Sequence, residues 1–262
     1  MNDNLKPTRV FAVDINPEIT AWAQQQYPQY WREDLGEKKR TSFLLSRALL
    51  HHVLYHYYDN TLSALPELAY SEHQKPYFKH YPIAFNLTHS ADFIGLVIAE
   101  GDLPIGIDIE TIQHRRNFEG LLKRTFHESE ISWVLKTIDK VYPLNISSEI
   151  MDHLPQKAME RFFLLWSAKE AYLKADGRGI QGLHSVLFSP ERATMTGDLA
   201  NGTLLATVLP SQHSDQLSSF AVYIPTTNEK LQTIKYLLIR DQEVCFQNHH
   251  ATWQVIMQDT SH

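Results

Sequence analysis

Three acidic residues in two segments of the chain are candidates for holding a divalent cation. Asp108 and Glu110 are separated by one residue within an apolar run, and Glu170 follows about sixty residues later. In an extended strand, residues i and i+2 point to the same face, with their Cα atoms about 6.5–7 Å apart. Carboxylate oxygens suit a hard cation such as Mg²⁺, which usually keeps water and substrate phosphates among its ligands. An isolated Asp-x-Glu pair also occurs on solvent-facing strand edges, so the pair needs support from other residues.

Glu170 belongs to a segment whose hydrophobic spacing predicts an α-helix over 158–175. Trp166, Glu170 and Lys174 recur every four residues and would share one face of that helix, with Lys169 beside them. A surface ion pair between Glu170 and Lys174 would account for part of this pattern. Most other positions of the helix are apolar, however, so the charges are expected to face a polar cleft. A carboxylate flanked by two lysines suits a metal ion bound to a diphosphate.

A polar loop is predicted at 86–90, between short strands at 83–87 and 93–99. Its sequence, Asn-Leu-Thr-His-Ser, offers hydroxyl groups, an imidazole and turn amides, which together suit an anion. The same residue types are common in turns that bind nothing. The loop therefore supports an anion site only in combination with the charged residues described above.

Two segments that would position these residues are repeated along the chain. Residues 11–16 resemble residues 105–110, and residues 43–48 resemble residues 163–168, in the same order. Repeats in a fixed order indicate a duplicated structural unit, and the junction of two such units commonly binds ligands. The sequence therefore predicts an α+β fold of two similar α/β subdomains, related by a pseudo-two-fold duplication, with the active site in the cleft between them. The halves would be residues 1–104 and 105–262.

The remaining elements follow from hydrophobic spacing. The first half is expected to open with a buried strand over 10–15 and to contain a helix over 37–58. The second half would contain a strand over 105–109 and a helical segment over 117–140. A polar stretch at 137–156 reads as an insertion. The β-rich tail is expected to complete the sheet of the second half, with runs at 186–188, 203–209, 220–224, 234–239 and 252–257.

Composition excludes several classes of protein. The 262 residues are 43% hydrophobic and 21% charged, with a formal net charge of -6, which argues against a general nucleic-acid binder. No apolar stretch is long enough to cross a membrane, and the polar start does not predict a secretory signal. The single cysteine, Cys245, is interpreted as a packed thiol in a reducing compartment, so a cytoplasmic protein is expected. His52 and His56 have the helical spacing of a zinc pair, but without a third ligand a surface helix is favoured.

Taken together, these segments resemble the signatures of the 4′-phosphopantetheinyl transferases, in the longer, surfactin-type class in which one chain carries two similar halves. The resemblance rests on Gly-Ile-Asp-Ile-Glu at 106–110, Phe-Asn-Leu-Thr-His-Ser at 85–90, and the Trp-x-x-Lys-Glu-x-x-x-Lys helix at 166–174. Lys75-Pro76 and Arg47 also fall where this family places coenzyme A contacts. The resemblance covers about residues 32–187.

This resemblance implies a Mg²⁺-dependent transferase that moves 4′-phosphopantetheine from coenzyme A to a serine of an apo acyl or peptidyl carrier protein and releases 3′,5′-ADP. It implies Asp108, Glu110 and Glu170 as metal ligands, and Glu170, Asp108 and Lys174 as the catalytic group. Glu130 and a metal-bound water remain alternatives to Glu170 as the base. The implied coenzyme A contacts are Arg47, Lys75, Pro76, Thr88, His89, Asp108, Lys169 and Lys174.

Departures from the family pattern and two other functions stay open at this point. Thr88 stands where many members have Ser, and Gln74 precedes Lys75 where Gly is common, so that turn is expected to differ. Carrier docking would use Arg115-Arg116 and Lys123-Arg124, although a solvated basic helix start explains them equally well. The alternatives are a non-catalytic module that binds coenzyme A or carrier proteins, and a metal-dependent phosphohydrolase. A monomer is expected, and the carrier that it serves is left open.

Overall fold

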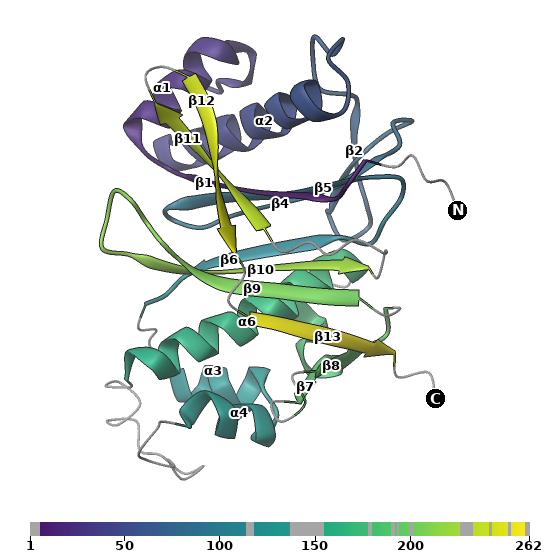
Figure 1. The fold of residues 1–262 in the computed structure, drawn as a ribbon, viewed down its shortest axis with the longest axis vertical. Coiled ribbons are helices and arrows are strands. Elements are labelled where there is room, and N and C mark those ends of the chain that lie inside the picture. Colours follow the sequence, from purple (N-terminus) through teal and green to yellow (C-terminus); the bar gives the residue numbers. More distant parts are fainter. Residues whose placement is uncertain are drawn as a thin grey trace.

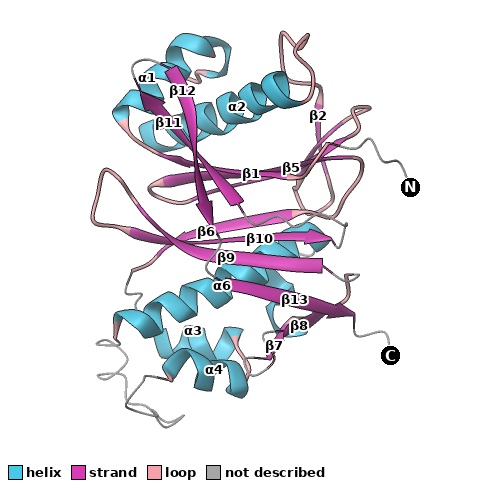
Figure 2. Ribbon diagram, in the orientation of Figure 1, coloured by secondary structure: helices cyan, strands magenta, loops and turns pink. Residues whose placement is uncertain are grey.

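The computed structural model describes residues 6–113, 118–136, 155–177, 180–189, 192, 194–199, 202–225, 233–240, 243–250 and 253–259. These residues form four layers, in which two β-sheets lie face to face between two outer layers of helices (Figures 1 and 2). The mixed α and β fold expected from the sequence is confirmed. No helix in these residues is long and apolar enough to span a bilayer.

The first half contributes one helical layer and most of one sheet. Its helices are α1 (Pro17–Gln26), a short 3₁₀ helix (Pro28–Tyr30) and α2 (Glu37–Tyr57), and its strands are β1 (Arg9–Asp14), β2 (Leu68–Tyr70), β3 (Pro76–Phe78), β4 (Ile83–His89) and β5 (Phe93–Glu100). Strands β2 and β3 form a separate hairpin.

The second half contributes the other helical layer and the other sheet. Its helices are α3 (Phe118–Thr125), α4 (Glu128–Leu135), α6 (Gln156–Asp176) and a 3₁₀ helix (Ile180–Ser185). Its strands begin with β6 (Gly106–Thr111), β7 (Leu187–Ser189), β8 (Thr194–Gly197), β9 (Gly202–Pro210) and β10 (Leu217–Pro225), and the chain continues with β11 (Thr233–Arg240), β12 (Glu243–His250) and β13 (Trp253–Asp259).

The strand orders show that the tail is shared between the two sheets. The first sheet has the order β12-β11-β1-β5-β4, and the second has the order β6-β10-β9-β13-β8-β7. Strand β11 pairs in parallel with β1, so residues 233–250 belong to the first sheet. The prediction that the whole tail completes the second sheet was therefore wrong, and a division at 104/105 does not separate the sheets. A free edge on β1 would leave backbone groups unpaired, and β11 covers that edge.

Three apolar clusters hold the layers together. Helix α2 packs Leu45, Leu49 and Val53 against the outer face of the first sheet, and α6 packs Phe163 and Tyr172 against the second. The third cluster lies between the sheets and joins the two halves; it includes Val10, Ala12, Val97, Ile107, Ile109, Phe220 and Val222. Burial of apolar surface between the sheets brings the edge strands β4 and β6 side by side.

Most predicted elements are present, with differences at their ends. The opening strand, helix α2, helix α6 and strand β6 are confirmed. Residues 86–89 belong to β4 and do not form a loop. The helical segment after 117 breaks at Phe126 and His127, because His127 and Glu130 form a capping box that starts α4. Helix α1 and strands β2, β3, β8 and β12 were not predicted. Arg115, Arg116 and most of the 137–156 stretch lie outside the described residues.

Candidate active site

The acidic strand β6 is placed as its alternation predicts. Ile107 and Ile109 face the first sheet in the apolar cluster between the halves, so Asp108 and Glu110 face α6. Gly106 lets the strand approach this helix closely. A Cβ atom at Gly106 would lie 2.0 Å from the backbone oxygen of Ala171 and 2.6 Å from the nitrogen of Ala175. The glycine of the Gly-x-Asp-x-Glu motif is therefore required by backbone packing.

Lys174 connects the acidic strand to the first half. Its ammonium donates to Asp108 Oδ1 at 2.7 Å and to Thr88 Oγ1 on β4 at 3.1 Å. The Asp108 side chain is 6% exposed, while that of Lys174 is 30% exposed and remains open to solvent. The structure thus brings together three of the predicted residues at the line where β4 lies beside β6. A partly exposed lysine at this position can also meet an anionic ligand.

Glu170 is one helical turn before Lys174 and is almost fully buried, with 6% of its surface exposed. Burial raises the pKa of Glu170 to about 7, the charges of Asp108 and Glu110 add to the rise, and Lys174 acts against it. A carboxyl group with this pKa exchanges a proton near neutral pH, which is the property required of a general acid or base.

Two carboxylate oxygens in this cluster lack partners. Asp108 Oδ2 and Glu170 Oε1 are buried and make no hydrogen bond to the described residues. A buried, unpaired carboxylate oxygen is costly unless a cation or water satisfies it. Among the described residues, no three His, Cys, Asp or Glu side chains converge closely enough to hold a metal ion by themselves. The donor set still suits Mg²⁺, which uses one or two carboxylates together with water and substrate phosphates.

A cationic pocket lies on the other face of β4. It has a volume of about 540 Å³, and Arg47, Pro76 and His89 of the predicted coenzyme A contacts line it. Arg47 Nη1 is buried without a hydrogen-bond partner, which favours an anion beside it. Lys38 and Lys39 line the same pocket and were not predicted as site residues. For Lys39, the signal was its i, i+4, i+8 spacing with Phe43 and Arg47 on α2.

Strand β4 separates the cationic pocket from the carboxylate cluster. Successive side chains of a strand point to opposite faces. Thr88 accordingly contacts Lys174, while the next residue, His89, lines the pocket. A ligand with a nucleotide at one end and a diphosphate further along would pass over the end of this strand.

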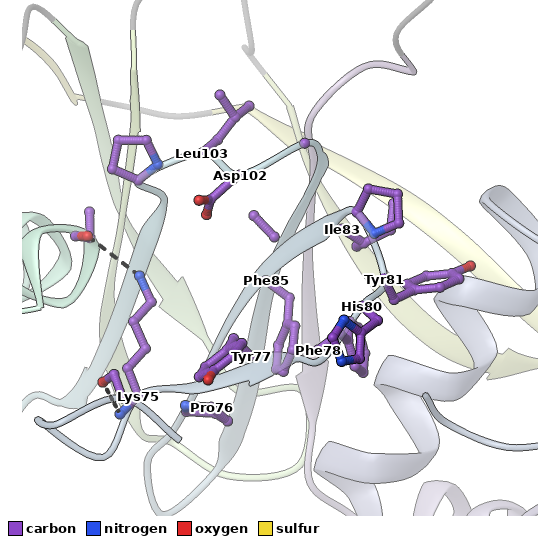
Figure 3. A pocket seen from close by; sticks show the side chains of 16 residues that line it. Lys75, Pro76, Tyr77, Phe78, His80, Tyr81, Ile83, Phe85, Asp102 and Leu103 are labelled. Carbon is purple, nitrogen blue, oxygen red and sulfur yellow. Dashed lines mark hydrogen bonds between the residues drawn. The ribbon is translucent and has the colours of Figure 1, made fainter. Parts of the chain in front are cut away.

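Lys75 does not line the cationic pocket. Its ammonium donates to the backbone oxygens of Ile105, just before β6, at 3.0 Å and of Ala175 on α6 at 3.4 Å. It lies beside a larger cavity of about 770 Å³, with Asp102 and Tyr77 also on its walls (Figure 3). Burial lowers the pKa of Lys75 to about 8, and Asp102 acts against this shift. Lys75 therefore joins the β2–β3 hairpin to the two elements that carry the acidic residues.

Lys169 and Glu130 lie inside the second half. Both side chains are 0% exposed, and they form an ion pair of 2.7 Å. Glu130 also accepts hydrogen bonds from the backbone N–H groups of His127 and Phe188. The expectation that Lys169 lies along a bound diphosphate was therefore wrong in this structure. Glu130 is also unsuited as a base, because both of its oxygens are occupied.

Of the two histidines considered as a zinc pair on α2, His52 is buried and His56 is exposed. His52 is 8% exposed, its Nδ1 is 3.0 Å from the Tyr27 hydroxyl, and its ring centroid is 4.2 Å from that of His56. The surface-helix interpretation was therefore wrong for His52. Burial is the main cause that lowers the pKa of His52 to about 4, so its imidazole is neutral at physiological pH.

Comparisons with known proteins show which family the chain belongs to. Residues 104–224 match the 4′-phosphopantetheinyl transferase superfamily. The chain is 30% identical over 189 residues to the 4′-phosphopantetheinyl transferase psf-1 of Bacillus pumilus, which covers 68% of this chain and 72% of that protein. It is 36% identical over 141 residues to 4′-phosphopantetheinyl transferase AcpT of Escherichia coli K12, covering 53% of this chain and 59% of that protein.

A third relative is the 4′-phosphopantetheinyl transferase gsp of Aneurinibacillus migulanus, which is 30% identical over 172 residues, covering 63% of this chain and 59% of that protein. The match therefore spans about three fifths of the E. coli and A. migulanus relatives. The chain belongs to the 4′-phosphopantetheinyl transferase superfamily.

Proposed function

We propose that this protein transfers 4′-phosphopantetheine from coenzyme A to a serine of an apo acyl or peptidyl carrier protein. The observation that carries the proposal is the position of the carboxylate cluster and the cationic pocket on either side of the end of β4. The nucleotide end of coenzyme A, with its 3′-phosphate, suits the pocket lined by Arg47, His89, Lys38 and Lys39. The diphosphate would then reach Lys174 and the carboxylates.

Mg²⁺ would be held by Asp108, Glu110 and Glu170, where it supplies positive charge against the diphosphate. The unpartnered oxygens of Asp108 and Glu170 support this assignment. Lys174 now neutralises Asp108, and its partly exposed side chain can turn to the diphosphate when coenzyme A binds.

The chemical step needs one proton acceptor and one stabiliser of negative charge. The serine hydroxyl attacks the phosphorus attached to pantetheine, a new P–O bond forms, and the bond to the ADP side breaks, so that 3′,5′-ADP leaves. Glu170 takes the serine proton; its pKa of about 7 belongs to the site without a metal ion, and a bound Mg²⁺ would lower it. Lys174 stabilises the charge that develops on the leaving oxygen. No covalent enzyme intermediate is required.

The architecture bears on the origin of the two halves and on the oligomeric state. The first strand of each half pairs antiparallel with the second strand of a hairpin, β1 with β5 of β4–β5 and β6 with β10 of β9–β10, which supports an origin by duplication. All of the proposed site residues come from a single chain, which supports a monomer as the working unit.

The release of 3′,5′-ADP tests the proposal against the other two functions. Protein, Mg²⁺ and coenzyme A are incubated with and without a panel of apo-carrier proteins, and 3′,5′-ADP is measured by chromatography. Release that requires a carrier supports transfer. Release without any carrier would indicate hydrolysis of the diphosphate, and binding of coenzyme A without release would indicate a non-catalytic module.

A further inference from the structure

The end of β1 carries the first half's counterpart of the acidic pair. Asp14 and Asn16 occupy the positions that Asp108 and Glu110 occupy in the second half. Asp14 is 2% exposed, and each of its carboxylate oxygens accepts a hydrogen bond from the Ser211 hydroxyl at 3.2 Å. Asp14 Oδ2 also accepts the backbone N–H of Gln212 at 2.5 Å.

These partners belong to the other half of the protein. Ser211 and Gln212 lie in the hairpin 211–216, which joins β9 to β10 and reaches toward the end of β1 (Figure 1). A second contact reinforces the first, because Asn16 Nδ2 lies 3.0 Å from His213 Nε2. We call this set of contacts the hairpin latch.

The hairpin latch lies away from the line along which the halves meet at the candidate active site. At that line, Asn86 Oδ1 on β4 accepts the N–H of Ile107 on β6 at 2.9 Å, and Lys174 contacts Thr88. Strand β1 is two strands in from β4, which places the latch about 10 Å from the line. Rotation of one half about the line would preserve the edge contacts but would separate Asp14 from the hairpin. The latch therefore opposes that rotation, together with the apolar cluster between the sheets.

The angle between the halves matters for a ligand that spans them. In the proposed function, the nucleotide end of coenzyme A lies in the first half and its diphosphate meets the carboxylates of the second. Strand β10, which continues from the hairpin, pairs directly with β6, and Ser219 is opposite Glu110. Movement of the hairpin would therefore displace the strand beside the acidic residues.

We propose that Asp14 is a positioning residue for the transfer reaction, which acts by holding the 211–216 hairpin and so fixing the nucleotide pocket relative to the metal carboxylates. This inference rests on the proposed function. Asp14→Asn removes the negative charge and one of the two acceptor oxygens, so the charge-assisted hydrogen bonds from Ser211 and Gln212 are replaced by fewer and weaker neutral ones and the latch is weakened.

The test compares a ligand that spans both halves with one that mainly occupies the first. For Asp14→Asn, the KM for coenzyme A is expected to rise about tenfold, because small misplacements of bound groups are costly. The dissociation constant of 3′,5′-ADP should stay within about twofold of the original value, because this ligand mainly occupies the first half and does not depend on the angle between the halves. Asp215→Asn makes the same chemical change at an exposed position of the same hairpin and should alter neither value. A general loss of structure would weaken both ligands together, and that result, or no change in either, would overturn the proposal.

A second variant and a binding measurement test the latch if Asp14→Asn does not fold or no transfer is seen. If Asp14→Asn does not fold, Ser211→Ala removes only the hydroxyl donor and should weaken coenzyme A selectively, by about threefold. If the unmodified protein transfers nothing, the proposed function fails, but calorimetric titration of coenzyme A and 3′,5′-ADP still tests the latch. A selective loss for coenzyme A supports the latch. Parallel losses, or an unmodified protein that binds neither ligand, contradict it.

Discussion

Replacing Glu170 by Gln should stabilise the protein while removing its activity. Burial and the neighbouring carboxylates raise the pKa of Glu170 from 4.5 to about 7. Each pKa unit corresponds to about 1.4 kcal/mol, so ionising Glu170 in the folded protein costs about 3 kcal/mol relative to the unfolded chain. The pKa of this acid is higher in the folded state. Its contribution to stability is therefore fully present below pH 4.5 and is lost as the pH rises through about 7.

The assay is urea unfolding without metal ions at pH 4.5 and pH 8.5. Glu170→Gln should have nearly the stability of the unmodified protein at the lower pH, and be more stable by about 3 kcal/mol at the higher pH. Glu160→Gln, on the same helix, is the matched control and should show no such difference, because Glu160 is only partly buried and lies ten residues before Glu170. A Glu170→Gln protein that is equally stable or less stable at pH 8.5 would refute the electrostatic account of the site.

Three other predictions follow from buried or strained residues. Lys169→Met should cost about 3–5 kcal/mol of folding free energy, because it leaves the buried Glu130 charge without a partner. The KM for coenzyme A, measured below the melting temperature, should be unchanged. A raised KM would place Lys169 at the substrate. The pKa of His52 is about 4 when folded and 6.5 when unfolded, so stability should fall by about 3 kcal/mol as the pH drops across that interval. Urea unfolding of His52→Asn should show a shallower dependence, and equal slopes would contradict the burial of a neutral ring. Gln74 has a φ of 62°, in the left-handed region that favours glycine, so Gln74→Gly should stabilise the fold by about 0.5–1 kcal/mol. Glu72→Gly in the same turn should destabilise the fold. The melting temperatures of the two variants test this prediction.

Local periodicity explains what the sequence could predict about the site. The alternation of Ile107 and Ile109 with Asp108 and Glu110 correctly predicted which side chains of β6 face away from the apolar interior. The i, i+4 spacing of Glu170 and Lys174 predicted a shared helical face, and both residues contribute to the electrostatics around Asp108. Each of these patterns depends only on the geometry of one strand or one helix.

Lys169 shows where local reasoning fails. It is adjacent to Glu170, but successive residues of a helix are rotated by about 100°, so the two side chains leave α6 in different directions. Its partner, Glu130, is 39 residues away in the sequence, and no local pattern joins them. The capping box of α4 and the burial of both side chains decide their pairing.

The shared tail could not be predicted for a related reason. Strands β11 and β13 both show an apolar character in short runs, yet β11 pairs with β1 in the first sheet and β13 pairs with β8 and β9 in the second. Alternation tells which face of a strand is buried, but not which sheet edge the strand extends. The same limit applies to the hairpin latch, because the contact of Asp14 with Ser211 joins residues 197 positions apart.

The mass of a carrier protein tests the central claim most directly. An apo-carrier protein is incubated with coenzyme A, Mg²⁺ and either the unmodified enzyme or Glu170→Gln, and the intact carrier is weighed by mass spectrometry. The account predicts a gain of about 340 Da, the mass of one phosphopantetheinyl group on serine, with the unmodified enzyme and no gain with the variant. A carrier that gains this mass equally with both proteins would contradict the assignment of the site, and a panel of carriers that gains no mass with the unmodified enzyme would contradict the proposed transfer.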